Sequence, residues 1–418
     1  MQELEQQIRK MGDAALSASR RLIKLSTKRK NLILESMADE LDSRRLTIKT
    51  ANAEDLKAAQ TAGLSGAMLE RLTLNDVRID AMIQGIRDVA ALNDPVGKRI
   101  WKRTRPNGLI IEKKRVPLGV VCIIFESRPN VTADAAVLCF KTSNAVILRG
   151  GKEARHSNTA IAEALRAGGA KAGMPDNAIQ LVETIDREAV RMLVQMDDRI
   201  DVVIPRGGES LIKAVVSNAT VPVLKHYKGV CNLYVDRDAD IQQALAVAEN
   251  AKCQRPGVCN AIENLLVHKD IAEKFLPELK EMAQKRGVTL RGCRKTCAII
   301  PECQRATEND WSEEYLDLIL AVRVVSNLNA AIEHINKYGS HHSDAIMTSD
   351  KRSANKFLKE VDSASVYVNA STRFTDGAMF GMGAEMGIST DKLHARGPMG
   401  LEELTSYKYI INGSGQIR

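Results

Sequence analysis

The chain of 418 residues carries 60 basic and 52 acidic residues, giving a net charge of +8, and it is 44% hydrophobic and 27% charged. No apolar run approaches the ~20 residues that span a membrane, and residues 1–30 contain no uninterrupted apolar segment of a secretory signal. We therefore expect a cytoplasmic protein with no membrane partner. Its length suits two or three domains, because single cores stop growing near ~250–300 residues.

The positive charge does not by itself indicate a nucleic-acid partner. Basic residues are scattered along the chain, and aromatic residues, at 4%, are too few for base stacking. We expect no nucleic acid; an anionic substrate or a phosphorylated cofactor accounts equally well for the charge. The eight cysteines are expected to be free thiols. Cys293, Cys297 and Cys303 lack the paired spacing of a zinc site, so we expect no metal.

The first ninety residues or so repeat apolar positions three or four apart, the spacing that predicts helices. Two β-like runs, Arg99–Thr104 and Leu109–Val116, then flank a Pro-Asn-Gly turn and predict a hairpin. A long charged hairpin has open edges, and such edges favour pairing with another subunit.

From Gly119 onward, short apolar runs alternate with amphipathic helices. The first series predicts strands at Val120–Phe125, Ala145–Leu148, Ala178–Val182 and Asp201–Ile204, with helices at Val131–Phe140, His156–Ala172 and Arg187–Val194. The second predicts strands at Cys231–Val235, Asn264–Val267, Leu318–Val325, Asp344–Met347 and Ser365–Val368, with helices at Ile241–Ala251, Ile271–Gln284, Leu328–Lys337 and Arg352–Val361. This alternation predicts an α/β fold with two parallel sheets, divided near Val221–Tyr227. Ligands of such folds bind at the carboxyl ends of the strands, in a crevice that we expect between the lobes.

Cys259 is the first candidate for catalytic chemistry. It lies between a Pro256-Gly257 turn and an Asn260-Ala261 step that leads into an apolar run. A thiol near free backbone N–H groups can be a nucleophile, because local dipoles favour the reactive thiolate. Simple packing is the alternative, and from the residues alone Cys253 is as eligible.

Two basic glycine turns each follow a predicted strand and precede a helix. One contains Arg149, Gly150, Gly151 and Lys152, and the other contains Arg206, Gly207, Gly208 and Ser210. Such turns bring the backbone close to a phosphate, and the two cations of the first could meet a ribose phosphate. Neither turn has the G-x-G-x-x-G spacing, so a purely steric need for glycine is the alternative.

A glycine-rich stretch, residues 380–388, could form an active-site wall or a tight structural crossing. Just before it, Asn369, Ser371 and Arg373 provide polar groups and a cation, which suit a substrate with a carboxylate.

Several strings carry a resemblance over nearly the whole chain: FESRPNVTADAAVLCFKTSNAVILRGGKEA, VCNAIENLLVH, EEYLDLILAVRVV, VSNLNAAIEHINKYGSHHSDAI and VNASTRFTDGAMFGMGAEMGIST. In this order they resemble the gamma-glutamyl phosphate reductase (glutamate-5-semialdehyde dehydrogenase) family of the aldehyde dehydrogenase superfamily. No glutamate-kinase segment precedes them, so the resemblance is to the free-standing reductase. It implies a separate glutamate kinase as functional partner, and a homodimer or homotetramer.

The resemblance implies NADPH-dependent reduction of L-glutamyl 5-phosphate to L-glutamate 5-semialdehyde, the second step of proline biosynthesis from glutamate. Cys259 falls on the family's nucleophile, the Arg149–Lys152 turn on the adenosine end of the cofactor site, the Arg206–Ser210 turn on its glycine turn, and Glu314 on the ribose-binding carboxylate. It implies two Rossmann-like lobes and a β oligomerisation flap. We expect an NADPH-binding domain at 1–225 with 370–402 packing back on it, a catalytic domain at 226–369, and the flap at 99–118 and 403–418.

Two positions depart from the superfamily pattern. Hydrolytic aldehyde dehydrogenases carry a Glu base before a glycine pair, whereas the matching stretch here offers Lys225; an oxyanion-stabilising Asn aligns near Ser127. Losing the base favours reduction of a Cys259 thioester over its hydrolysis. The oxyanion would need the backbone N–H of Cys259 and a side chain such as Asn260 or Ser127. We also expect Arg128 to bind substrate.

Two alternatives stay open. Another acylating aldehyde dehydrogenase, acting with coenzyme A or on another acyl phosphate, would have a similar sequence, and NADH is not excluded as the cofactor.

Overall fold

The computed structural model describes residues 2–64, 66–225 and 227–418, and the chain divides into two compact units. Unit 1 comprises Met1–Lys225, Gly381–Gly387 and Met399–Arg418, and unit 2 comprises His226–Phe380 and Ile388–Pro398. We expected segment 370–402 to pack on the first domain as a whole. Of this segment, residues 381–387 and 399–402 belong to unit 1 and the rest to unit 2.

Unit 1 opens with helices whose apolar residues recur on one face. They are α1 (Gln2–Leu22), α2 (Thr27–Ser43), α3 (Arg45–Thr61), α4 (Gly66–Leu72) and α5 (Asp76–Ala91). In α1, for example, Ile8, Ala15 and Leu22 are fully buried while the charged residues face outward. These helices precede the first sheet along the chain, as the spacing of apolar positions predicts.

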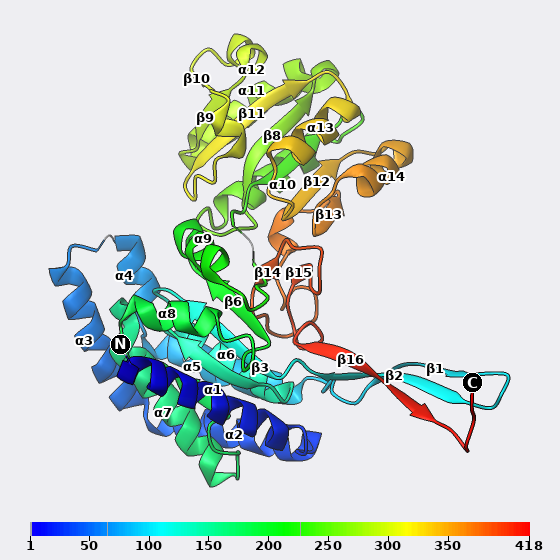
Figure 1. Cartoon of the computed structure of the whole chain (residues 1–418). Helices are drawn as coiled ribbons and strands as arrows, with labels where there is room; N and C mark the ends of the chain where they lie inside the picture. Colours follow the sequence, from blue (N-terminus) through cyan, green and yellow to red (C-terminus); the bar gives the residue numbers. More distant parts are fainter. Residues whose placement is uncertain (1, 65, 226) are drawn as a thin grey trace. The chain divides into compact units, whose positions relative to one another are not determined.

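The first sheet is parallel and has the strand order β5-β4-β3-β6. Its strands are β3 (Val120–Phe125), β4 (Ala145–Arg149), β5 (Ile179–Leu181) and β6 (Val202–Arg206). They alternate with α6 (Asn130–Lys141), the short η1 (Lys152–Ala154), α7 (Arg155–Lys171), α8 (Arg187–Val194) and α9 (Glu209–Asn218) (Figure 1). The strand order reverses between β3 and β6, which is the place where doubly wound sheets bind ligands.

A three-stranded antiparallel sheet extends as a narrow arm of unit 1 (Figure 1). The predicted hairpin, β1 (Arg99–Thr104) and β2 (Ile110–Pro117), pairs through β2 with the C-terminal strand β16 (Thr405–Asn412). Pairing in the described residues leaves β1 and β16 as the edges. On β16, Tyr407, Tyr409 and Ile411 are exposed.

The sheet of unit 2 is parallel throughout and has the order β10-β9-β11-β8-β7-β12-β13. Its strands are β7 (Cys231–Val235), β8 (Ile262–His268), β9 (Thr289–Gly292), β10 (Gln304–Arg305), β11 (Ile319–Val325), β12 (Ser343–Met347) and β13 (Ser365–Val368). The intervening elements are α10 (Ile241–Cys253), α11 (Lys269–Arg286), α12 (Arg294–Ile299), η2 (Asn309–Ser312), α13 (Leu328–Tyr338) and α14 (Lys351–Glu360), and then η3 (Thr372–Phe374), β14 (Ile388–Ser389) and β15 (Gly397–Pro398) follow.

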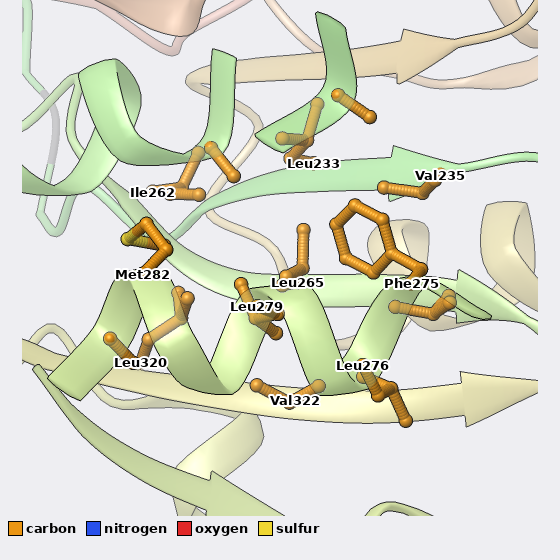
Figure 2. Packing of buried hydrophobic residues seen from close by; sticks show 14 of the residues in the cluster. Leu233, Val235, Ile262, Leu265, Phe275, Leu276, Leu279, Met282, Leu320 and Val322 are labelled. Carbon is orange, nitrogen blue, oxygen red and sulfur yellow. The ribbon is translucent and has the colours of Figure 1, made fainter. Parts of the chain in front are cut away.

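One hydrophobic core of unit 2 lies between the sheet and helices α10 and α11, and a second packs α13 and α14 against the sheet. Figure 2 shows Phe275 and Leu279 of α11 packed toward Leu265 of β8 and Val322 of β11. All four side chains are fully buried, which at ~25 cal/mol per Å² is the main favourable term for this layer. A core on this face holds β7 and β8, and therefore the loops that enter them, in fixed register.

Among the helices of the described residues, none is long and apolar enough to cross a membrane.

Candidate active site

Cys259 lies in unit 2, in the loop that joins α10 to β8. Because β7 and β8 are parallel, this loop lies at the amino ends of the strands. The reason is topological: a helix-to-strand connection enters a strand at its amino end. The Cys259 thiol therefore lies on backbone turns and not at the N-terminus of a helix.

The backbone of Cys259 is anchored on one side and open on the other. Its carbonyl oxygen accepts a hydrogen bond from the Sγ of Cys231 at 3.1 Å. Within the described residues, the N–H groups of Cys259 and Asn260 donate no hydrogen bond, and the Cys259 side chain is half-buried. Open N–H groups beside a nucleophile can donate to the oxyanion formed in acyl transfer.

Gly229 packs directly on Cys259. A Cβ at Gly229 would lie 2.2 Å from the carbonyl oxygen of Cys259 and 2.5 Å from its Cα, so only glycine fits. The N–H of Gly229 donates to Oε1 of Glu314 at 2.9 Å. Glu314, the expected ribose carboxylate, thus lies one hydrogen bond from the residue that supports the nucleophile.

Asn260 ties the Cys259 loop to the η3 segment. Its Nδ2 donates to the carbonyl of Thr375 at 2.9 Å, its Oδ1 accepts from Nη1 of Arg373, and its own carbonyl accepts from Oγ1 of Thr372 at 2.7 Å. The side-chain amide therefore holds the loop in place. Only the backbone N–H of Asn260 is open for the oxyanion role that we expected of this residue.

A buried ion pair spans the two ends of the loop. Nζ of Lys252, in the last turn of α10, lies 2.6 Å from Oε2 of Glu263, in β8, and both side chains are completely buried. Burial raises the pKa of Glu263 to about 7 against the effect of Lys252, and Glu314 acts in the same direction as burial. Because a lone buried charge is costly, this pair constrains both ends of the loop.

The other thiols differ from Cys259 in their surroundings. Burial raises the pKa of Cys231 well above its usual range and also raises that of Cys253. For Cys293, burial is outweighed by hydrogen bonds that involve Thr296 and the Val324 N–H, which lower its pKa. Cys293 follows β9, however, while Cys259 alone combines a half-buried thiol with the open N–H groups described above.

In unit 1, the expected cofactor turns follow β4 and β6, but carboxylates from the same unit already contact this region. Oε2 of Glu126, just after β3, accepts from the N–H of Gly208 at 2.8 Å. Oε1 of Glu153 accepts from the N–H and the Oγ of Ser127, at 2.6 and 2.8 Å. A phosphate bound at the Gly208 N–H must therefore displace Glu126, and Ser127 must leave Glu153 before it can donate to an oxyanion.

Two cations at the first turn fit a phosphorylated ribose. Arg149 is half-buried, and its Nε has no hydrogen-bond partner, while its Nη1 and Nη2 donate to the carbonyls of Gly150 and Ile185. Lys152 is exposed, and no ion pair in the described residues includes it. The unpartnered N–H of Arg149 can donate to an incoming anion, and the exposed Lys152 can pair with its charge.

The remaining expected residues have mixed environments. Ser371 caps η3 by accepting from the N–H of Arg373. Both ends of the Asn369 amide bond the backbone of Thr348, so this side chain is committed to the loop. Arg128 and Ser210 are exposed, and the guanidinium of Arg206 lies where a Cβ at Gly387 would be.

Sequence reasoning missed the residues that act through distant contacts. Glu126, Glu153 and Gly229 belong to no motif, because their partners lie 26 to 82 residues away. The Lys252–Glu263 pair, 11 residues apart, belongs to no motif either. One signal was available: Lys252 and Glu263 are charged residues within segments otherwise suited to burial, and such residues are usually paired.

The model of the aldehyde dehydrogenase family matches residues 2–317. With two helix-covered parallel sheets and a half-buried loop thiol, this match defines the class: an oxidoreductase of the aldehyde dehydrogenase fold, which acts with a nicotinamide cofactor.

The relatives narrow the class. The gamma-glutamyl phosphate reductase of Moorella thermoacetica is 56% identical over 412 residues, 99% of each chain. That of Persephonella marina is 54% identical over 417 residues, 98% of this chain and 94% of the relative. The crystal structure of gamma-glutamyl phosphate reductase from Thermotoga maritima matches with a TM-score of 0.97 at 46% identity, covering 98% of this chain and 99% of that one. The chain belongs to the gamma-glutamyl phosphate reductases of the aldehyde dehydrogenase family.

Proposed function

We propose that the protein reduces L-glutamyl 5-phosphate to L-glutamate 5-semialdehyde with NADPH and releases phosphate, the second step of proline biosynthesis from glutamate. The observation that carries this proposal is the 56% identity, over 99% of both chains, to a protein of that activity by name. The Cys259 loop supplies a suitable nucleophile.

The thiolate of Cys259 attacks the acyl carbon of the substrate. The bond from that carbon to the phosphate oxygen breaks, phosphate leaves, and a thioester remains on Sγ. The open N–H groups of Cys259 and Asn260 donate to the oxyanion that forms on the way. Cys231 and Gly229 hold the backbone of Cys259 during this step.

When bound, the cofactor supplies the hydride that reduces the thioester. We assign its adenosine phosphate to Arg149 and Lys152, its pyrophosphate to the turn from Arg206 to Ser210, and a ribose to Glu314. Arg149 has an unpartnered buried Nε, which supports the extra phosphate of NADPH over NADH. Unit 1 is accordingly the cofactor-binding domain and unit 2 the catalytic domain.

The replacement of the hydrolytic base has a chemical consequence for the thioester. Lys225 stands in the stretch where hydrolytic relatives carry a Glu, so no carboxylate of that stretch activates water against the thioester. The acyl group is kept for the hydride.

We also propose a functional link to a glutamate kinase and assembly with further copies of this chain. An acyl phosphate of this kind is made by phosphorylation of a carboxylate, so a separate glutamate kinase supplies the substrate. The open edges of β1 and β16 and the exposed aromatic residues on β16 support assembly into a homodimer or homotetramer. We place the enzyme in the cytoplasm as part of the same proposal.

The reverse reaction tests the proposal. The wild-type protein should reduce NADP⁺ in the presence of glutamate 5-semialdehyde and phosphate, whereas Cys259→Ala should abolish turnover and still bind NADPH. Normal turnover by Cys259→Ala, or a requirement for coenzyme A in place of phosphate, would overturn the proposal.

A further inference from the structure

A guanidinium of η3, that of Arg373, contacts the Cys259 loop through neutral acceptors. Arg373 is half-buried, and its Nε donates to Oε1 of Gln254 at 3.1 Å while its Nη1 donates to Oδ1 of Asn260. Both acceptors are neutral amides of the loop that bears the nucleophile. Across residues 227–418, no carboxylate forms an ion pair with Arg373.

A second guanidinium acts on the same place. Arg255, which lies in the Cys259 loop four positions before Cys259, is exposed and makes no hydrogen bond or ion pair with any described residue. Burial lowers the pKa of Arg373, the charge of Arg255 adds to this, and Cys259 and Asp376 oppose it. Arg373 thus lies within electrostatic reach of Arg255 and of the nucleophile.

The carboxylate of Asp376 acts on Arg373 through its charge, but the two form no ion pair in the described residues. Its Oδ1 accepts from the N–H groups of Ala378 and Met379, in the turn after η3. Two like charges beside a nucleophile, one of them partly desolvated, cost free energy unless an anion joins them. The two guanidinium groups can therefore receive an anion.

The substrate of the proposed reaction offers two anions. The phosphoryl group is bonded to the carbon that Cys259 attacks, whereas the α-carboxylate lies at the other end of a chain of three carbons. Arg373 is hydrogen-bonded to the residue next to Cys259, so it is placed for the group nearest the reacting carbon. A phosphate dianion also matches two guanidinium groups better than a carboxylate does.

We infer that Arg255 and Arg373 form the subsite that holds the phosphoryl group of the acyl phosphate, and that receives inorganic phosphate in the reverse direction. This inference rests on the proposed function. It replaces the α-carboxylate as the expected ligand of Arg373. When the acyl–oxygen bond breaks, the two cations stabilise the departing phosphate, and no proton needs to be supplied to it.

Arg255→Gln is the cleanest test, because Arg255 holds no structural contact. In the reverse reaction, phosphate and semialdehyde are separate substrates, so their KM values report the two anion sites separately. We expect Arg255→Gln to raise the KM for phosphate about tenfold or more, as for the loss of a charge-assisted hydrogen bond, and to leave the KM for semialdehyde unchanged. Arg352→Gln, at an exposed arginine of α14, is the matched control and should change neither.

Alkylation of Cys259 gives a readout that needs no turnover. Inorganic phosphate should protect the wild-type thiol from iodoacetamide, and Arg255→Gln and Arg373→Lys should each need about tenfold more phosphate for the same protection. Equal protection in Arg255→Gln and wild type, or a rise in the semialdehyde KM alone, would overturn the inference. If wild type shows phosphate protection but no phosphate-dependent turnover, the proposed function fails and the anion subsite stands.

Discussion

Gly229 approaches the backbone of Cys259 so closely that no side chain fits between them. In Gly229→Ala the new methyl group must push the Cys259 loop away, and a displacement near 1 Å costs on the order of 100-fold in rate. We therefore expect kcat to fall about 100-fold while NADPH binding persists. Stopped-flow and binding measurements check this.

The control is Gly85→Ala in α5, where a Cβ meets nothing within 4 Å. Unchanged kcat and a gain of up to about 1 kcal/mol in stability are expected there, because alanine favours the helix. If Gly229→Ala keeps full activity, the Cys259 backbone is not held as described.

Glu126 would compete with a cofactor bound as proposed. Its carboxylate accepts from the Gly208 N–H, where the pyrophosphate is proposed to bind. Replacing it in Glu126→Gln removes a like charge worth about 1 kcal/mol, so the Kd for NADPH should fall about fivefold. Fluorescence titration measures this, with Glu163→Gln, an exposed carboxylate of α7, as the control of equal charge. Weaker binding by Glu126→Gln would mean that the carboxylate contacts the cofactor favourably.

At the scale of elements, α13 is fixed to the sheet of unit 2 by a buried histidine. Nδ1 of His334 accepts from Nη1 of Arg323 at 2.8 Å, and Trp311 packs edge-on against the imidazole. Burial, followed by the charges of Arg323 and Lys337, lowers the pKa of His334 to about 3.

This histidine makes stability depend on pH. Between about pH 6.5 and 3, the unfolded chain binds a proton that folded His334 does not, so the free energy of unfolding decreases as pH falls through this window. From pH 6.5 to 5.0 the loss is about 2 kcal/mol. We expect His334→Gln to lose this part of the slope in urea unfolding, and His156→Gln, an exposed histidine, to keep it. An identical slope in wild type and His334→Gln would contradict this account.

Elements with strong local patterns were predictable from the sequence. The apolar run Val120–Phe125 and the largely apolar run Cys231–Val235 form β3 and β7 with the predicted bounds. The edge of unit 2 was missed, because β9 and β10 are only four and two residues long and carry charges. Within the site, the sequence singled out Cys259 and the glycine turns. The contacts of Glu126 and Arg373 depend on partners more than 80 residues away and have no local signal.

At the scale of the whole molecule, the arm of unit 1 predicts self-association. Tyr407, Tyr409 and Ile411 lie on alternate positions of the edge strand β16 and are 50%, 53% and 58% exposed, so they share one apolar face. We expect Tyr409→Lys to dissociate the oligomer in sedimentation velocity. Leu358→Lys, on α14, should leave its mass unchanged. An unchanged mass for Tyr409→Lys would place the interface elsewhere.

We propose, above all, that the thioester on Cys259 reacts with hydride in the forward direction and with phosphate in the reverse direction, and that it does not react with water. A pre-steady-state measurement with semialdehyde and NADP⁺, in the absence of phosphate, tests it most directly. The wild-type protein should form a burst of NADPH equivalent to one per active site and then stop. Addition of phosphate should restart NADPH formation. The Cys259→Ala variant should show no burst. Continuous NADPH formation without phosphate, or a burst in Cys259→Ala, would contradict the account.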